Sequence, residues 1–227
     1  MNKFVPVVLV ILFFLTSPLF SLGFDFGVYG GKDFYKISEM QKNFQLADLT
    51  AASVEREGVQ NPWMFGANFR LNFIGGISLE TTAEAAYAKY KVIYSIPSNP
   101  STDEYDITWT RIAVLATLEK NLFSAPTTEL YGGIGGGLHM VTPVVSDKFL
   151  INTLKDKSAE LDVSEDINLE SKFGGHALVG FQFHPPLTPI KFKLEGKYII
   201  LPKGDYEEPN SFFTVYLGIM YSLGLGL

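Results

Sequence analysis

Residues 129–140 read ELYGGIGGGLHM, and five of the six positions from Gly132 to Gly137 are glycine. A glycine-rich run can cradle a phosphate, or it can form a strand with no room for side chains. The phosphate-loop motif requires a lysine directly after its last glycine, and a dinucleotide motif that starts at Gly133 requires glycine at its sixth residue. Leu138 stands at both of these positions, so neither phosphate motif is present.

The same stretch alternates between two faces with the period of a strand. The apolar face holds Leu130, Gly132, Ile134, Gly136, Leu138 and Met140. The opposite face holds Glu129, Tyr131, Gly133, Gly135, Gly137 and His139. Because glycine within a strand marks a bend or a close approach of other groups, we expect Gly133, Gly135 and Gly137 to make room for long side chains from other strands.

Seven further segments alternate in the same way. They are FDFGVYGGKDF (24–34), WMFGANFRLNF (63–73), SLETTAEAAYAKY (78–90), YDITWTRIAVLATLE (105–119), KFGGHALVGFQF (172–183), IKFKLEGKYII (190–200) and FFTVYLGIMYSLGL (212–225). In the segment 105–119 the alternation changes phase near Thr110 and Arg111, which predicts a β-bulge there. Lysines of the segment 190–200 are candidates for filling the space beside the glycine strand.

The connections between these segments alternate in length. Those after the second, fourth and sixth segments are short, whereas 35–62, 91–104 and 141–171 are long. Short turns at one end and long loops at the other are typical of a transmembrane β-barrel. We therefore predict an all-β fold, an eight-stranded antiparallel up-and-down barrel with short periplasmic turns and long, partly helical extracellular loops.

Two helices are predicted inside the long connections. In the first connection, apolar residues recur at spacings of three and four, which is typical of an amphipathic helix. These residues are Ile37, Met40, Phe44, Ala47, Ala51 and Val54. A shorter helix is predicted from Lys148 to Leu161. Each helix can pack locally within its loop, or it can cover the barrel mouth and bind a partner.

Alternation alone does not decide which face looks outward, because a soluble lipocalin-like barrel has the same pattern with its apolar face inside. The polar face of 212–222 carries no charge and half of that of 129–140 is glycine, so both suit a crowded interior better than a water-facing surface. Aromatic residues also lie on the apolar faces near both strand ends, as in the two girdles of a barrel in a bilayer. They are Phe73, Phe183, Phe192 and Tyr221 near the short turns, and Phe65, Tyr87, Phe173 and Phe213 near the long loops. The pattern therefore favours a barrel in lipid.

The N-terminal residues predict export. Lys3 precedes an apolar run from Phe4 to Leu15 that is too short for the ~20 residues of a membrane-spanning helix. The layout is that of a signal peptide cut before Phe24. We therefore expect residues 1–23 to be a cleaved signal peptide and 24–227 to be one barrel domain.

Composition excludes several alternatives. The chain of 227 residues has no cysteine, so it has neither a disulfide framework nor a lipid-attachment site. Its net charge of −6 argues against nucleic acid as a partner. It is 47% hydrophobic, yet the expected mature segment holds no apolar run long enough for a helical span, so strands must carry the apolar surface.

The stretch YLGIMYSL, residues 216–223, has a polar residue, then Gly218, then Tyr221 and Leu223 two positions apart. The layout of eight alternating segments resembles the small eight-stranded outer-membrane barrels of the OmpA, OmpX, Opa and OmpW kind. The stretch 216–223 resembles the C-terminal β-signal of this group. Chains of this group often stop at an aromatic residue, whereas this one continues to Leu227. The resemblance implies localisation in the cell outer membrane, contact with its lipids, recognition by the assembly machinery through the C-terminal strand, and a monomer.

Two functions fit this resemblance. One is a structural and surface-interaction scaffold whose loops contact an extracellular partner, and the other is a minor OmpW-like channel for small or hydrophobic solutes. A lipid-modifying outer-membrane enzyme is a distant third. We expect His139 and His176 to be hydrogen-bonded lumen residues and His184 to lie in a turn, so no residue is assigned as catalytic or cofactor-binding.

The acidic run DVSEDINLE places oxygen ligands at Asp162, Ser164, Asp166, Asn168 and Glu170. A calcium loop of the EF-hand type requires glycine and glutamate where Ile167 and Phe173 stand. The run is therefore interpreted as a solvated loop, and no metal ligand is assigned.

The hairpin between the second and third segments fixes a register. A three-residue turn, Ile74-Gly75-Gly76, keeps both polar faces on the same side, whereas a two-residue turn would put one of them outside. The three-residue turn places Arg70 opposite Glu80, and we expect these two side chains to form an ion pair inside the barrel.

We predict that the mature chain is a heat-modifiable membrane barrel, because a closed barrel keeps its backbone groups paired in detergent. Unheated and boiled samples of extracted membranes should migrate differently on a denaturing gel. Identical migration, together with fractionation as a soluble periplasmic protein, would favour the lipocalin-like alternative.

Overall fold

The computed structural model describes residues 21–45, 51–96, 99–142, 144, 170–203 and 210–224. The strands in these parts are β1 (Ser21–Phe34), β2 (Lys36–Ile37), β3 (Met40–Gln45), β4 (Ala51–Arg56), β5 (Val59–Gln60), β6 (Trp63–Phe73), β7 (Ile77–Ile96), β8 (Asn99–Ala125), β9 (Thr128–Val141), β10 (Glu170–Phe183), β11 (Ile190–Ile200) and β12 (Ser211–Gly224). No helix in the described part of the chain is long and apolar enough to cross a membrane.

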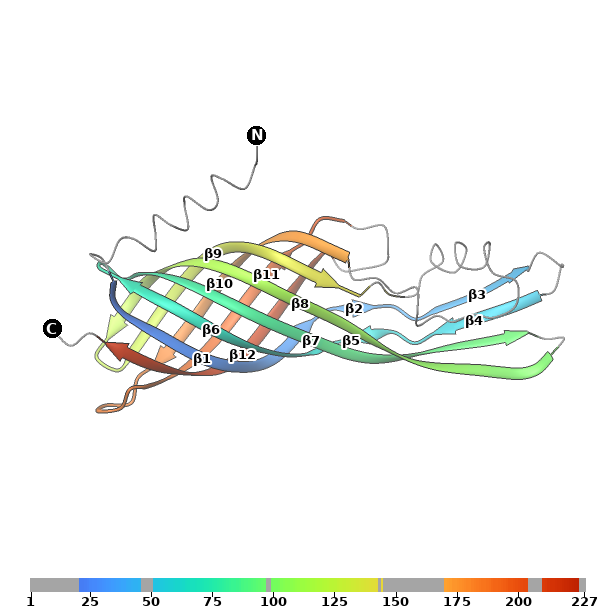
Figure 1. Cartoon of the computed structure of the whole chain (residues 1–227), viewed down its shortest axis with the longest axis horizontal. Helices are drawn as coiled ribbons and strands as arrows, with labels where there is room; N and C mark the ends of the chain where they lie inside the picture. The colour runs from blue at the N-terminus through green and yellow to red at the C-terminus, as the bar shows by residue number, and fades with distance from the viewer. Residues whose placement is uncertain are drawn as a thin grey trace, which may run out of the picture.

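Eight of the strands close into a barrel. Antiparallel pairing runs in the order β7-β6-β1-β12-β11-β10-β9-β8, and β8 pairs back onto β7 to complete the ring. Every segment predicted from alternation is one of these eight strands, so the predicted up-and-down barrel is confirmed. In Figure 1 the barrel lies on the left, and β1 begins and β12 ends at the barrel end that carries the short turns. We call this end the turn end and the opposite one the loop end.

The predicted hairpin register is also confirmed. Phe73 pairs with Ile77 and Arg70 pairs with Glu80 across β6 and β7. The turn between them needs two left-handed residues, and glycine supplies both, with φ of 79° at Gly75 and 69° at Gly76. The turn chemistry therefore sets which side chains of this hairpin face the lumen.

The β-bulge predicted near Thr110 and Arg111 is wrong. Pairing between β7 and β8 continues through both residues without a shift in register. Polarity changes phase there because Trp109 and Leu115 are apolar and yet point inward, with exposed fractions of 1% each. The register shifts of β8 lie elsewhere: against β9 between Asn121 and Phe123, and against β7 between Ser95 and Ile96.

The helix predicted within 35–62 is also wrong, because this connection contains β2, β3, β4 and β5. β3 pairs with β4, and β4 pairs with the far end of β7, where Arg56 lies opposite Val92. The apolar residues that suggested a helix therefore include residues on a β-hairpin. The spacing of apolar residues in this connection fits either a helix or a strand. Pairing of β4 with the edge of β7 stabilises the strand. The second predicted helix, 148–161, lies outside the described residues.

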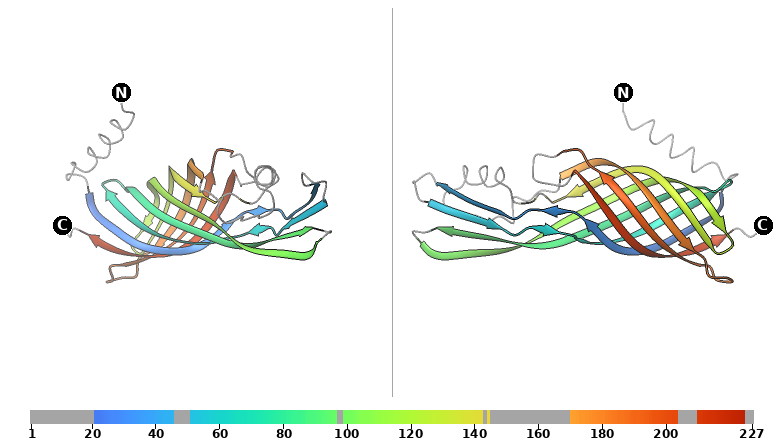
Figure 2. Two further views of the ribbon diagram at one scale, coloured as in Figure 1. Left: turned by 45° about the vertical axis from the view of Figure 1, so that its right-hand side comes forward. Right: turned by 180° about the vertical axis from the view of Figure 1, so that it is seen from behind.

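The connection 91–104, predicted as a long loop, consists largely of strand. β7 and β8 stay paired as far as Ile96 and Asn99, well beyond the last β8–β9 pair at Arg111 and Val141. Figures 1 and 2 show these two strands leaving the loop end of the barrel with β3 and β4 beside them. We call the sheet formed by β3, β4, residues 88–96 of β7 and residues 99–110 of β8 the protruding sheet.

The lumen-facing glycines make room for side chains of the adjacent strands. A Cβ atom at Gly133 would lie 2.9 Å from Thr117 Cγ2 on β8, and one at Gly135 would lie 2.7 Å from His176 Cε1 on β10. The expectation of room for long neighbours is correct, but at these two positions the neighbours come from β8 and β10 rather than from the lysines of β11.

We predict that Gly180→Ala destabilises the barrel by about 1–3 kcal/mol through overpacking. A Cβ at this lumen-facing position would lie 2.6 Å from Tyr131 Cε2, and the aromatic ring is itself fully buried. The matched control is Gly175→Ala on the outward face of the same strand, where the nearest atom is the Gly135 carbonyl oxygen at 3.8 Å. Urea unfolding in detergent micelles measures both variants, and equal midpoints would contradict the prediction.

Candidate functional site

The lumen is filled by charged side chains arranged in layers. Near the turn end, Lys191 Nζ lies 2.9 Å from Asp25 Oδ2, which also accepts a hydrogen bond from Asn72 at 3.0 Å. The next layer centres on Arg70, whose guanidinium lies 2.9 Å from a carboxylate oxygen of Glu119. These pairs join β1 to β11 and β6 to β8, so side chains as well as backbone hold the ring together.

The expected Arg70–Glu80 ion pair is wrong, although the register that suggested it is correct. Arg70 reaches past β7 to Glu119, and its Nε donates to Ser78 Oγ at 2.9 Å on the way. Glu80 instead accepts from Lys193 Nζ at 3.0 Å across the lumen and from Asn68 Nδ2 at 2.8 Å. A long cationic side chain in a narrow barrel can thus choose among several strands, and opposite register positions do not decide its partner.

Carboxylate oxygens of Glu80, Glu119 and Glu195 lie within 4.8 Å of one another in the middle of the lumen. Three acidic groups this close can in principle hold a cation. Lys193 already contacts Glu80 at 3.0 Å and Glu195 at 3.1 Å, and Arg70 contacts Glu119. The arrangement is therefore an ion-pair network in which protein ammonium and guanidinium groups supply the positive charge.

The layer nearest the loop end centres on Arg111 of β8. Its guanidinium contacts Asp33 at 2.8 Å and Glu84 at 3.3 Å. Thr214 donates a hydrogen bond to Asp33 at 2.8 Å, and Lys197 forms a further ion pair with Glu84. Because burying an unpaired charge costs several kcal/mol, this density of opposite charges is what lets the lumen remain ionic.

Above the charged layers, the loop end is filled by an apolar cluster. Tyr35 packs edge-on against Trp109 and Phe212, with ring centroids 5.3 Å and 5.4 Å away. The cluster, here called the apolar plug, comprises Tyr29, Tyr35, Ile37, Val54, Val59, Met64, Ala86, Tyr90, Val92, Trp109, Val141, Val144, Ile199, Leu201, Phe212 and Tyr216. It joins the barrel interior to the base of the protruding sheet.

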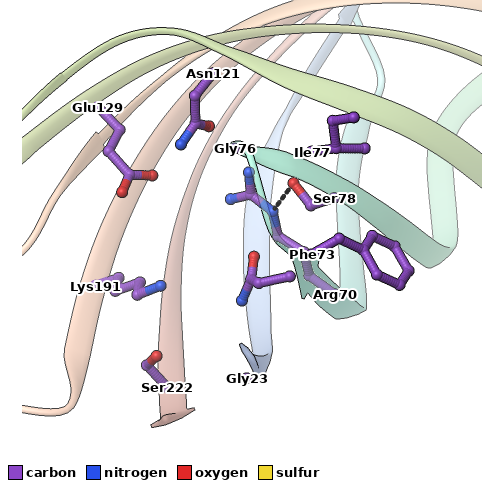
Figure 3. A pocket seen from close by; sticks show the side chains of 11 residues that line it. Gly23, Arg70, Phe73, Gly76, Ile77, Ser78, Asn121, Glu129, Lys191 and Ser222 are labelled. Carbon is purple, nitrogen blue, oxygen red and sulfur yellow. Dashed lines mark hydrogen bonds between the residues drawn. The ribbon is translucent and has the colours of Figure 1, made fainter. Parts of the chain in front are cut away.

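A small polar pocket opens at the turn end. It has a volume of about 250 Å³ and is lined by Gly23, Arg70, Asn72, Phe73, Gly76, Ile77, Ser78, Asn121, Glu129, Lys191 and Ser222. Figure 3 shows Arg70 hydrogen-bonded to Ser78 at its wall, with Lys191 and Glu129 on the opposite side. The cations that line it, Arg70 and Lys191, are already paired with Glu119 and Asp25.

The histidines lie where the sequence placed them. His176 Nε2 is 2.8 Å from Thr117 Oγ1, and His139 Nδ1 is 3.5 Å from an Arg111 nitrogen, both inside the barrel. Neither contact is with a serine or a carboxylate. His184 follows β10 in a turn, where partial burial lowers its pKa. Of the acidic run, only Glu170 belongs to the described residues.

The protruding sheet has two unlike faces. One face is charged, where Lys91 Nζ lies 3.3 Å from Glu104 and Gln41 donates to Glu55 at 2.6 Å. The hydrogen bond with Glu104 raises the pKa of the exposed Lys91 side chain. The other face is apolar, with Tyr90 and other members of the plug buried along it. The sheet is therefore one continuous structure with the barrel.

The outer wall of the barrel is apolar from strand to strand. Its exposed residues include Phe26, Val28, Phe65, Phe69, Val114, Leu118, Ile134, Val179, Phe181, Leu194, Leu217 and Ile219. Seven of the eight aromatic residues predicted for the two girdles are exposed on this wall, whereas Phe73 is half-buried and lines the turn-end pocket. Lys32 Nζ lies 4.4 Å above the Trp63 ring near the loop end. A closed antiparallel barrel with an apolar belt, aromatic girdles and a polar interior is the outer-membrane type.

The chain has the fold of the small eight-stranded β-barrels of the outer-membrane type. No protein-family model matches its sequence, and neither does any curated protein. Among solved structures it is similar to neisserial surface protein A, with 11% identity, coverage of 89% of this chain and 97% of that one, and a TM-score of 0.49.

Two further solved structures are similar. Ail, the attachment invasion locus protein of Yersinia pestis, in complex with the heparin analogue sucrose octasulfate, is 14% identical, with 88% of this chain and 97% of that chain covered and a TM-score of 0.45. The N-terminal β-barrel domain of Pseudomonas aeruginosa OprF is 9% identical, with coverage of 90% and 99% and a TM-score of 0.43. Identities this low speak only of the fold, and the fold here rests on the ring of eight strands.

Sequence reasoning found the lumen face but missed the protruding sheet. A signal for it was present, because Val92 and Tyr94 follow Tyr90 at the two-residue spacing of a strand, past the predicted end of the third segment. The predicted third segment, 78–90, therefore ends six residues short of the end of β7 at Ile96.

We predict that Arg70 couples energetically with Glu119 and more weakly with Glu80. Arg70→Met should destabilise the barrel by roughly 3–5 kcal/mol, because it leaves a buried carboxylate unpaired. Glu119→Gln combined with Arg70→Met should cost less than the sum of the single changes. Urea unfolding in micelles supplies the energies, and the control cycle uses Glu80→Gln. Additive effects at Glu119 would show that the ion pair does not form.

Proposed function

We propose that the protein is a surface-interaction scaffold of the outer membrane that displays the protruding sheet to the cell exterior. The observation that supports this most directly is the continuity between the barrel and the sheet. β7 and β8 run without a break in pairing from Ile77 and Lys120 at the turn end to Ser95 and Thr102 in the sheet. A β-ladder of this length holds the displayed surface at a fixed angle, which a flexible loop would not.

The contents of the lumen support a scaffold over a channel. Ion-pair layers cross the barrel at several heights, and the apolar plug fills the loop end with rings such as Trp109 and Tyr90, each about 2% exposed or less. Opening a water path would require breaking buried charge pairs and separating packed aromatic rings. The turn-end pocket has Arg70 in its lining, and this side chain is paired with Glu119.

Processing and assembly belong to the same proposal. Residues 1–23 act as the signal peptide, and residues 24–227 form the mature barrel. The last strand, β12, carries the YLGIMYSL stretch and pairs with β1 to close the ring. We infer that the assembly machinery recognises this strand and that the mature barrel works as a monomer in contact with outer-membrane lipids.

We predict that Asp106→Cys reacts with a membrane-impermeant maleimide on intact cells, because Asp106 is exposed on the protruding sheet. The matched control is Thr188→Cys, an exposed residue of the β10–β11 turn, which should react only after the outer membrane is disrupted. The chain has no native cysteine, so each label reports one position. The opposite labelling pattern would place the sheet in the periplasm.

Planar-bilayer recording tests the channel alternative on the same protein. The scaffold proposal expects no stable large conductance, since the lumen is filled. Reproducible open channels from the purified native chain would contradict it.

A further inference from the structure

The turn-end pocket is lined mainly by polar side chains. Seven of its eleven lining residues are polar, and they come from six different strands of the barrel. Polar groups that converge on a concave site fix the orientation of a small ligand. The volume of about 250 Å³ lies below the roughly 300–1,000 Å³ of pockets for drug-sized ligands, so it suits a smaller molecule. The groups that lack a partner indicate which kind of molecule this is.

Among the described residues, one carboxylate of the pocket wall has no partner. Glu129 is half-buried, and its carboxylate takes part in no ion pair and no hydrogen bond with this part of the chain. The two cations of the wall are engaged elsewhere, Arg70 with Glu119 and Lys191 with Asp25. A partly desolvated carboxylate favours a cationic partner. The pocket therefore offers a place for an ammonium group.

Two further polar groups of the wall keep unused hydrogen-bonding capacity. The Lys191 ammonium has three N–H donors, and one of them goes to Asp25 Oδ2 at 2.9 Å. The Lys191 side chain is 13% exposed, so its other donors can be reached from the pocket. Asn121 Oδ1 is buried and has no hydrogen-bond partner in the described structure. A buried acceptor of this kind is costly unless a ligand or a water molecule donates to it.

Figure 3 shows how the charged groups of the pocket lie. Glu129 and Lys191 are on the same side, whereas the Arg70 guanidinium and Ser78 form the facing wall. Among the described contacts, the Lys191 ammonium pairs with Asp25 and not with Glu129. An anionic and a cationic group thus lie side by side on one wall. An α-amino acid carries an ammonium and a carboxylate group on the same carbon atom, so it is the charge complement of this wall.

We propose that the turn-end pocket binds a free α-amino acid with a polar side chain. The ammonium group of the amino acid pairs with Glu129, and its carboxylate accepts hydrogen bonds from Lys191. Its side chain extends towards Asn121, whose unpartnered oxygen accepts a hydrogen bond from an amide or hydroxyl group. The site lies at the opposite end of the barrel from the protruding sheet, so it is independent of the scaffold function proposed above.

Ions of a single sign fit this wall less well. A metal cation at Glu129 would lie on the same side of the pocket as the Lys191 ammonium, which repels it. An inorganic anion at Lys191 would lie on the same side as Glu129, and the buried Asp25 carboxylate is already in contact with that ammonium. A zwitterion meets an opposite charge at both positions and leaves the net charge of the pocket unchanged.

The test uses the isotope-labelled mature barrel in lipid nanodiscs and three probes of similar size. L-glutamine carries both charges, glutaramic acid is glutamine without its ammonium group, and γ-aminobutyramide is glutamine without its carboxylate. In nuclear magnetic resonance spectra, glutamine should shift the backbone amide signals of Gly76 and Ser222, which line the pocket, in a saturable way. Each analogue should bind about tenfold or more weakly, because it leaves one charge of the wall unpaired. Absence of saturable shifts with glutamine, or equal affinities of the three probes, would overturn the proposal.

Glu129→Gln locates the ammonium contact. The variant keeps the shape of the side chain and removes its charge, so it should weaken glutamine binding by about tenfold and leave the affinity for glutaramic acid unchanged. The matched control, Asp106→Asn, removes a carboxylate from an exposed position of the protruding sheet and should change neither affinity. Heat-modifiability on a gel checks that both variants fold. An equal loss of affinity for glutamine and glutaramic acid, or no loss for either, would show that the ammonium group does not bind at Glu129, and the proposal would be wrong.

Discussion

A sheet in hydrocarbon has to pair every backbone N–H and C=O group, because no water is present to replace a missing partner. The ring from β7 through β1 and β12 to β8 meets this constraint by closure. Eight strands enclose so little space that side chains fill it. The outward face must be apolar, so the inward face takes the polar residues, and closure of the backbone thereby decides the chemistry of the lumen. Gly133 and Gly180 lie where a neighbouring side chain has already taken the available space.

Alternation predicted the ring because one face of each strand meets lipid, which requires an apolar side chain at every second residue. The Ile74-Gly75-Gly76 turn predicted one register because left-handed backbone and face parity are local properties. The partner of Arg70 could not be predicted in this way, since a long side chain selects among groups brought together by closure of the whole ring. The β3–β4 hairpin escaped prediction for a related reason, because the edge that β4 joins on β7 is distant in sequence.

The same strand obeys two different rules along its length. From Arg111 towards the turn end, β8 pairs with β7 on one side and β9 on the other, as a strand in lipid requires. From Thr110 towards Asn99, β7 is the only strand that β8 pairs with among the described residues. The end of the β8–β9 ladder at Arg111 and Val141 therefore separates the closed barrel from the protruding sheet.

The charged lumen is better understood as a device for register than as a source of stability. Buried ion pairs roughly offset their own desolvation, but a buried charge without its partner costs roughly 3–5 kcal/mol. A slip of one residue between two strands would move Arg70 or Lys193 to the lipid face, and the apolar belt alone forbids it. A slip of two residues keeps every face correct, so the belt cannot exclude it. It would, however, separate Arg70 from Glu119 and Lys193 from Glu80. The ion pairs thus select among the registers that the apolar pattern leaves equivalent.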